Sequence, residues 1–177
     1  MLTMSDFVKS LIKDIIGAAI LTAVVISFVR PTIVKQTSMQ DTLNPNDYII
    51  MYRMAYSGDK EPKRGDIVIF KSELQDENGK NKLLIKRVIG LPGDKITIND
   101  GKVYINDKEY DESYLKDGYT TGSVNNFKVP KGEYFVMGDN RVVSIDSRYS
   151  EVGCIKKDAI KGRAVLRLFP FTKIKKL

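Results

Sequence analysis

Residues 95–110, KITINDGKVYINDKEY, decide the class of the fold. Apolar and polar residues alternate on both sides of an Asn-Asp-Gly turn signal: Ile96 and Ile98 precede it, and Val103 and Ile105 follow it. Alternation with a period of two is typical of half-buried strands, and a short turn containing Gly joins two such strands. The stretch therefore predicts an antiparallel β-hairpin.

The sequence on both sides of this hairpin shows the same pattern of short strands and turns. Short apolar or β-branched stretches are separated by turn residues, and helical periodicity after residue 40 is confined to a short stretch near 156–160. Further strands are expected at 48–56, 65–70, 83–91 and 164–171, with a strand pair at 126–140 around Pro-Lys-Gly. Residues 72–81 are polar and predict a surface loop or hairpin tip. The body is therefore expected to be mainly β, with antiparallel strands.

A long apolar run precedes the β body. Residues 15–29, IIGAAILTAVVISFV, carry no charge, and the run from about residue 11 approaches the roughly 20 residues that cross a bilayer as a helix. A cleavable signal peptide would end in small residues, and a buried core helix would show a polar face; the run has neither feature. We expect a membrane anchor over residues 11–30, after a tail of residues 1–10. Basic residues are balanced across it, so charge alone leaves its orientation open.

Composition excludes several classes of site. The 177 residues contain one cysteine, Cys154, and no histidine, so an intramolecular disulfide is impossible and a metal site is not expected. The net charge is +7, but no nucleic-acid-binding motif accompanies it. We expect no cofactor and no nucleic-acid partner, and we assign the positive charge to a membrane surface.

Ser38 raises a chemical question. It lies in QTSMQDTL (36–43), shortly after the apolar run, in a chain that lacks the histidine of a Ser-His-Asp triad. A base for Ser38 would have to be Lys, Asp, Glu or Tyr. Lys86, in LLIKRVIG (83–90), is flanked by apolar residues, and burial would favour its neutral, basic form. The alternative is that Ser38 is an ordinary loop hydroxyl and that Lys86 reaches water from a strand edge.

A third stretch is MGDNRVVSIDSR (137–148). Ser144, Asp146 and Arg148 alternate, so they share one face of an extended segment, and the last two can pair to fix the loop. A polar surface turn is the alternative interpretation.

Together the three stretches resemble the bacterial type I signal peptidases of peptidase family S26. The matching segments are Ser38-Met39, Lys86-Arg87 with the turn at 90–94, and Gly138 to Arg148, in the same order over essentially the whole chain. The short length is similar to the minimal Gram-positive-type form with one membrane span. The resemblance implies an antiparallel, barrel-like β domain of the signal peptidase and LexA-like type. It also implies a single-pass protein of the cell membrane, with a cytoplasmic N-terminus and an extracytoplasmic peptidase domain over residues 31–177.

The resemblance also implies roles for individual residues of a serine endopeptidase, signal peptidase I. Ser38 would be the nucleophile and Lys86 its general base, Ser144 would orient Lys86, and Asp146 and Arg148 would hold their loop. The residues expected to line the pockets for small residues at the first and third positions before the cut are Val34, Met39, Leu43 and Ile85. The expected partners are signal-peptide-bearing preproteins and the phospholipid membrane, and the protein is expected to be a monomer.

Three positions depart from the family pattern. Gln36 stands where a small residue or Ser is usual, Asp41 where Pro is usual, and Val143 where Asn is usual. These departures bear on the oxyanion hole, and they keep open a catalytically weak or inactive membrane-anchored β-domain binding module as the alternative. A self-cleaving repressor-like Ser-Lys protease would need a DNA-binding domain where this chain has its apolar run.

Overall fold

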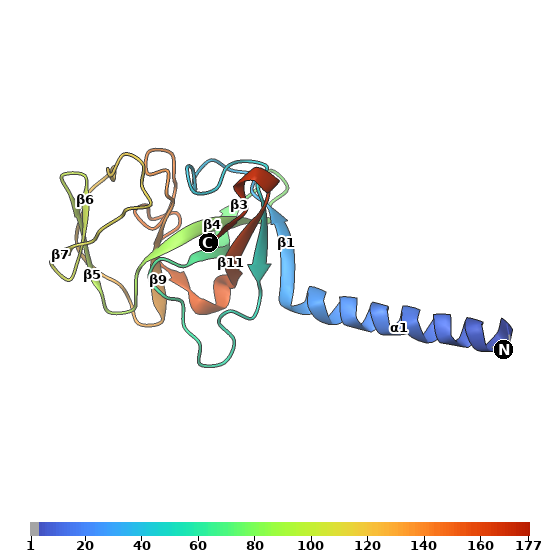
Figure 1. The fold of residues 1–177 in the computed structure, drawn as a ribbon. Helices are drawn as coiled ribbons and strands as arrows, with labels where there is room; N and C mark the ends of the chain where they lie inside the picture. The colour runs from blue at the N-terminus through green and yellow to red at the C-terminus, as the bar shows by residue number, and fades with distance from the viewer. Residues whose placement is uncertain (1–3) are drawn as a thin grey trace.

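The structure is a computed structural model and describes residues 4–177. Helix α1 spans Met4–Phe28, and its segment Phe7–Phe28 is long and apolar enough to cross a membrane, with a mean hydropathy of 2.1. No residue of that segment is buried against the rest of the chain, and Figure 1 shows α1 extending away from the β body. Part of the expected tail, residues 1–3, lies outside the described residues, and the remainder of it is helical.

The helix ends two residues earlier than the expected boundary at residue 30. Strand β1 (Val29–Ile33) begins directly after it, because Val29 and Arg30 already pair with strand β2 (Tyr48–Tyr52). The amide of Arg53 also donates a hydrogen bond of 2.8 Å to the carbonyl of Phe28. Helix and body are therefore joined without an intervening loop.

The other strands follow in chain order: β3 (Ile67–Gln75), β4 (Asn81–Gly90), β5 (Lys95–Asn99), β6 (Lys102–Ile105), β7 (Lys108–Glu109), β8 (Val124–Lys128), β9 (Glu133–Met137), β10 (Ile155–Lys156), β11 (Ile160–Phe169) and β12 (Lys175–Lys176). Two 3₁₀ turns, η1 (Lys157–Ala159) and η2 (Phe171–Lys173), flank β11. Within residues 4–177 the strands form two antiparallel sheets. The larger has the order β1-β2-β11-β3-β4-β9-β10, with β12 added to β11, and the smaller has the order β7-β6-β5-β8. The expected mainly β, antiparallel class is confirmed.

The hairpin at 95–110 is confirmed in its predicted register. Ile96 pairs with Ile105 and Ile98 with Val103, so all four side chains share one buried face. The turn between them, Asp100-Gly101, has positive φ at both residues, 50° and 79°. This is the conformation that matches the twist of a two-residue hairpin and that Asp-Gly adopts readily.

The strand pair expected at 126–140 is wrong. Both strands exist, but β8 pairs with β5 in the smaller sheet, whereas β9 pairs with β4 and β10 in the larger one. The reason lies just after β8, where Val129 exchanges backbone hydrogen bonds with the turn at Gly93 and Asp94 instead of with β9. The Pro-Lys-Gly segment therefore carries the chain from one sheet to the other.

Both faces of the larger sheet are covered, which explains the continuous apolar run of β3. Ile67 and Ile69 pack in one core cluster with Met39, while Val68 and Phe70 pack in another on the opposite face. A third cluster joins β4 and β9 to the smaller sheet, which lies at the end of the body opposite α1 (Figure 1). Strand β4, which carries Lys86, is therefore held firmly between β3 and β9.

Candidate active site

Ser38 lies in the turn that follows β1 and is half-buried. Its neighbour Met39 is 1% exposed and anchors the turn in the core. The turn is closed by the amide of Leu43, which donates a 2.8 Å hydrogen bond to the carbonyl of Met39. The carbonyl of Ser38 in turn accepts a 3.0 Å hydrogen bond from the amide of Asn140. The serine is therefore fixed both to the core and to the loop that follows β9.

Lys86 is buried in the middle of β4, with 2% of its surface exposed. Within residues 4–177 its amine has no hydrogen-bond partner, and no salt bridge involves it. Desolvation by burial lowers the pKa of Lys86 to about 8; nearby Asp146 and Asp139 raise that pKa, and Arg148 lowers it. A substantial fraction of Lys86 is therefore neutral near pH 8, as a general base requires. The alternative in which Lys86 reaches water from a strand edge is not observed.

The pairing of β4 with β9 brings Lys86 next to the third motif. Arg87 pairs with Met137, so the antiparallel register, continued by one residue, sets Lys86 opposite Gly138. Residues opposite each other in such a pair have Cβ positions about 5 Å apart. Lys86 therefore lies next to Gly138, in agreement with the effect of the charges of Asp146 and Asp139 on its pKa.

Gly138 is packed against both of the other motif segments. A Cβ atom at this position would lie 2.3 Å from the Oγ of Ser144 and 2.3 Å from the carbonyl oxygen of Ser38. Only a residue without a side chain allows so close an approach. The segments of Ser38, Lys86 and Ser144 therefore meet around Gly138.

The loop from Gly138 to Arg148 is ordered by a buried carboxylate. Asp146 is fully buried and forms a salt bridge with Arg148, with Oδ1 2.8 Å from Nε. Its Oδ2 accepts hydrogen bonds from the Ser144 hydroxyl at 2.5 Å and from the Gly138 amide at 3.0 Å. The expected Asp146–Arg148 pair is present. The Ser144 hydroxyl bonds to Asp146 and the Gly138 amide, and it has no hydrogen bond to Lys86 among the described residues.

A second buried ion pair, which our sequence analysis did not single out, holds the residue next to Lys86. The Arg87 guanidinium donates to both oxygens of Asp139, at 2.9 and 2.6 Å. It also donates to the Gly65 carbonyl at 3.0 Å and lies over the ring of Tyr114, 4.0 Å from the centroid. The sequence feature that could have predicted this pair is an arginine at an expected buried strand position, because a buried charge requires a partner.

A third buried ion pair, between Arg141 and Glu112, stabilises the loop from Gly138 to Arg148. Arg141 donates from Nε to the Gly138 carbonyl at 2.9 Å and pairs with both carboxylate oxygens of Glu112, at 2.8 and 2.5 Å. The side chains of Arg141 and Glu112 are 2% and 8% exposed. No local pattern reveals this partnership, since the two residues are distant in sequence and lie in loops.

A groove of about 730 Å³ lies next to the Ser38 turn: its lining includes Gln36 and Met39, on either side of the serine in the chain, but neither Ser38 nor Lys86. Three of the expected substrate-binding residues line it, namely Val34, Met39 and Ile85. Leu43, the fourth, is 0% exposed in the core beneath and is not part of the groove wall. Of the family departures, Gln36 lines the groove, whereas the side chains of Asp41 and Val143 are exposed.

The groove runs between two strand edges that have no partner in the described part of the chain. Strand β1 is the end strand of the larger sheet and pairs only with β2. Strand β9 pairs with β4 only from Arg87 onward, so the segment 81–85 of β4 is open on that side. Unpaired backbone groups of this kind are a template for adding an extended peptide.

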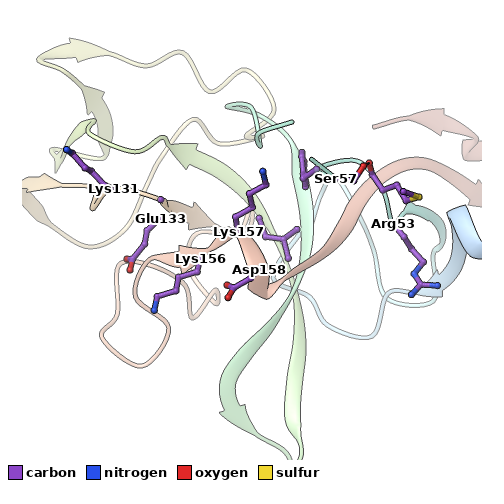
Figure 2. A pocket seen from close by; sticks show the side chains of 11 residues that line it. Arg53, Ser57, Lys131, Glu133, Lys156, Lys157 and Asp158 are labelled. Atoms are coloured by element: carbon purple, nitrogen blue, oxygen red, sulfur yellow. The ribbon is translucent and has the colours of Figure 1, made fainter. Parts of the chain in front are cut away.

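A second pocket, of about 600 Å³, lies between the loop after β2 and the segment around η1. Figure 2 shows its lining, with Lys131 at one end and Arg53 at the other. It contains no residue of the three motifs, and it shares only Arg53 with the groove beside the Ser38 turn.

Comparison with known proteins identifies the family. The sequence model of the family "Signal peptidase, peptidase S26" matches residues 8–169. The chain belongs to this signal peptidase family. It is 40% identical over 176 residues to signal peptidase I of Bacillus licheniformis, covering 93% of this chain and 90% of that protein. It is 35% identical to a probable signal peptidase I-2 of Synechocystis, covering 90% of this chain and 74% of that protein.

The structural comparison agrees. The crystal structure of a signal peptidase I from Enterococcus faecalis superposes with a TM-score of 0.51 at 33% sequence identity, covering 61% of this chain and 100% of that one. The expected family, the β fold with an N-terminal apolar helix and the enzyme class of a signal-peptidase-type serine peptidase are confirmed. Signal peptidases of this family are membrane-anchored, and α1 is consistent with such an anchor.

Proposed function

We propose that this member of the signal peptidase family removes N-terminal signal peptides from exported preproteins, with Ser38 as nucleophile and Lys86 as general base. One observation carries the proposal: Lys86 is buried, its pKa is lowered to about 8, and it lies beside the loops that hold Ser38. No histidine is present to act instead.

The chemistry is an acyl transfer in two halves. The neutral amine of Lys86 takes the proton of the Ser38 hydroxyl as its oxygen attacks the carbonyl carbon before the scissile bond. The backbone N–H of Ser38 donates to the oxyanion that forms. The Lys86 ammonium then protonates the departing amine, the C–N bond breaks, and an acyl-enzyme remains. Water, deprotonated by Lys86, hydrolyses the ester and releases the signal peptide with a free carboxylate.

Ser144, Asp146 and Arg148 support this step without touching substrate. The Asp146 charge raises the pKa of Lys86, which favours the ammonium as it forms. Arg148 is hydrogen-bonded to both Asp146 oxygens and keeps that carboxylate in place. The Ser144 hydroxyl, bonded to Asp146 and close to Gly138, orients the amine as Lys86 moves toward Ser38; this role is a prediction.

The substrate binds as an extended strand in the groove beside Ser38. Its backbone pairs with the open edges of β1 and β4, and its side chains alternate between the groove floor and solvent. The floor of the groove is lined by Val34, Met39 and Ile85, whose side chains limit the space for substrate side chains. We therefore expect small residues at the first and third positions before the cut. A role for Leu43 in these pockets stays a prediction, and its burial favours an indirect one, beneath Met39.

We further propose that α1 spans the cell membrane once, with the N-terminus in the cytoplasm and residues 31–177 on the extracytoplasmic face. The monomeric state stays a prediction. Protease added to intact spheroplasts should digest the β domain in this orientation. Protection of the domain until the membrane is broken would contradict it.

The dyad is tested by cleavage of a secretory precursor in detergent. Ser38→Ala and Lys86→Ala should each lower kcat on the order of 10⁴-fold or more, because a nucleophile or its base is lost. Ser57→Ala and Lys71→Ala, at exposed positions away from the motifs, are the matched controls and should keep wild-type rates. A Lys86→Ala variant with near wild-type activity would show that the dyad is wrong.

The exposed Gln36 beside the groove keeps the inactive binding module as a second candidate. An acylating inhibitor that traps active serines separates the two. A covalent adduct on Ser38, found by peptide mass spectrometry and missing in Lys86→Ala, supports the peptidase. A folded wild-type protein that forms no adduct and cuts no precursor would support the module.

A further inference from the structure

The groove beside Ser38 combines an apolar floor with a cationic lining. Val34, Met39 and Ile85 supply apolar surface. The charged residues that line it are five cations and one carboxylate: Arg30, Lys35, Arg53, Lys82, Lys161 and Asp76. A groove with this lining repels cations and attracts anions, because low-dielectric walls focus the field of one sign of charge.

These cations are not neutralised by the protein itself. All five are exposed, and none forms a salt bridge with a residue in the described range 4–177. The one carboxylate, Asp76, accepts hydrogen bonds of 2.9 Å from the amides of Asn78 and Lys80 and thereby holds its own turn. The positive charge of the groove is therefore available to a ligand.

The charges follow the path expected for the substrate upstream of the cut. Arg53 lies at the end of α1, since its amide bonds to the Phe28 carbonyl, and Arg30 lies one strand away on β1. Lys35 precedes Ser38 by three residues, and Lys82 lies on the open segment of β4 that precedes Lys86. Cations thus flank the groove from the helix end to the serine.

We propose that this groove selects its substrates by charge: it favours signal peptides with acidic or uncharged residues just before the cut and disfavours those with basic residues there. The inference rests on the proposed function and adds a substrate preference to it. An anionic lipid headgroup would also match the charge. The two open strand edges and the apolar floor fit an extended peptide instead, because they offer backbone pairing and side-chain contacts that a phosphate does not use.

The test uses three precursors that differ only in one residue, Glu, Gln or Lys, at the second or the fourth position before the cut. In nonionic detergent at low salt, kcat/KM should fall in the order Glu, Gln, Lys, by about threefold per step, as expected for exposed charge pairs. The differences should shrink strongly at about 0.5 M salt, because screening acts on exposed charges.

Variants of two groove lysines and of one matched control lysine test whether the groove causes the charge preference. The double variant Lys35→Gln and Lys82→Gln should bring the Glu-to-Lys ratio of kcat/KM close to one. Lys131→Gln, at another exposed lysine, in the pocket of Figure 2, should leave that ratio unchanged.

The outcomes separate this inference from the proposed function. If wild type cleaves the Gln precursor but shows no dependence on charge, the charge selection is wrong and the peptidase stands. If wild type fails to cleave any of the three, the proposed function itself is wrong. Charge-independent cleavage together with vesicle binding that needs phosphatidylglycerol and both lysines would assign the cations to lipid and overturn the inference.

Discussion

The backbone carbonyl of Ser38 is held by the amide of Asn140 through a hydrogen bond of 3.0 Å. This bond connects the loop after β1 to the loop after β9, which belong to opposite parts of the larger sheet. The position of the serine is therefore set by the loop that also carries Ser144 and Asp146. Changes that displace this loop should move Ser38 as well as the surroundings of Lys86.

Gly138→Ala should abolish activity. The added Cβ would lie 2.3 Å from both the Ser144 Oγ and the Ser38 carbonyl oxygen, so at least one must move. We expect kcat to fall at least about 100-fold, since displacements of about 1 Å cost this much. Val142→Ala, in the same loop but 75% exposed, is the control and should leave kcat almost unchanged. An active Gly138→Ala enzyme would show that the three segments are not held together there.

The pH dependence of precursor cleavage should report Lys86. Burial lowers the pKa of this lysine to about 8, and only the neutral amine accepts the Ser38 proton. We expect kcat/KM to rise about tenfold per pH unit below that value and to level off above it. The profile is measured with the Gln precursor in detergent, with Ser38→Ala as the blank. A rate that stays constant from pH 6 to 9 would exclude Lys86 as the base.

Lys86→Met should stabilise the protein at neutral pH while it abolishes catalysis. The pKa of Lys86 is lowered from 10.5 to about 8 by folding, so the unfolded chain binds the proton more tightly. Folding with a charged Lys86 is therefore penalised fully below pH 8, and the penalty fades as pH rises from 8 to 10.5. It amounts to about 3 kcal/mol at pH 7. Urea unfolding at pH 7 and at pH 10 should show a gain for Lys86→Met that is large only at pH 7; equal gains would contradict the assignment.

The Glu112–Arg141 pair should be important for stability. Glu112→Gln leaves a guanidinium that is 2% exposed without its carboxylate, which costs about 3 kcal/mol or more for a buried pair. Glu109→Gln breaks the Lys102–Glu109 pair, whose side chains are 51% and 53% exposed, and should change Tm very little, because water screens an exposed ion pair. Thermal unfolding of both variants compares them directly. Similar shifts in Tm would show that Arg141 does not depend on Glu112.

Much of this architecture was predictable from local patterns. The alternation of Ile96 and Ile98 with Val103 and Ile105 predicts the hairpin in its observed register, because a period of two fixes which face is buried. The uncharged run at 15–29 predicts the helix. The apolar neighbours of Lys86 predict its burial, since both faces of a central strand are covered.

What could not be predicted depends on contacts between distant segments. Nothing near Val129 indicates that it bonds to Gly93 and Asp94, so the division of β8 and β9 between two sheets was missed. The partnership of Arg141 with Glu112 likewise exists only because the fold brings two loops together. The hydrogen bond between Ser144 and Asp146, instead of one to Lys86, depends on the geometry of a single loop.

Because α1 continues directly into β1, the distance between the end of the helix and Ser38 is limited. Ser38 is the tenth residue after Phe28, so the serine lies no farther than about 35 Å from the end of the helix. With α1 in a bilayer, this distance sets an upper limit to the height of the serine above the membrane, because no loop between α1 and β1 adds length. On the proposed function, we expect a precursor whose apolar segment holds its cleavage site beyond this height not to be cleaved, however well its side chains fit the groove.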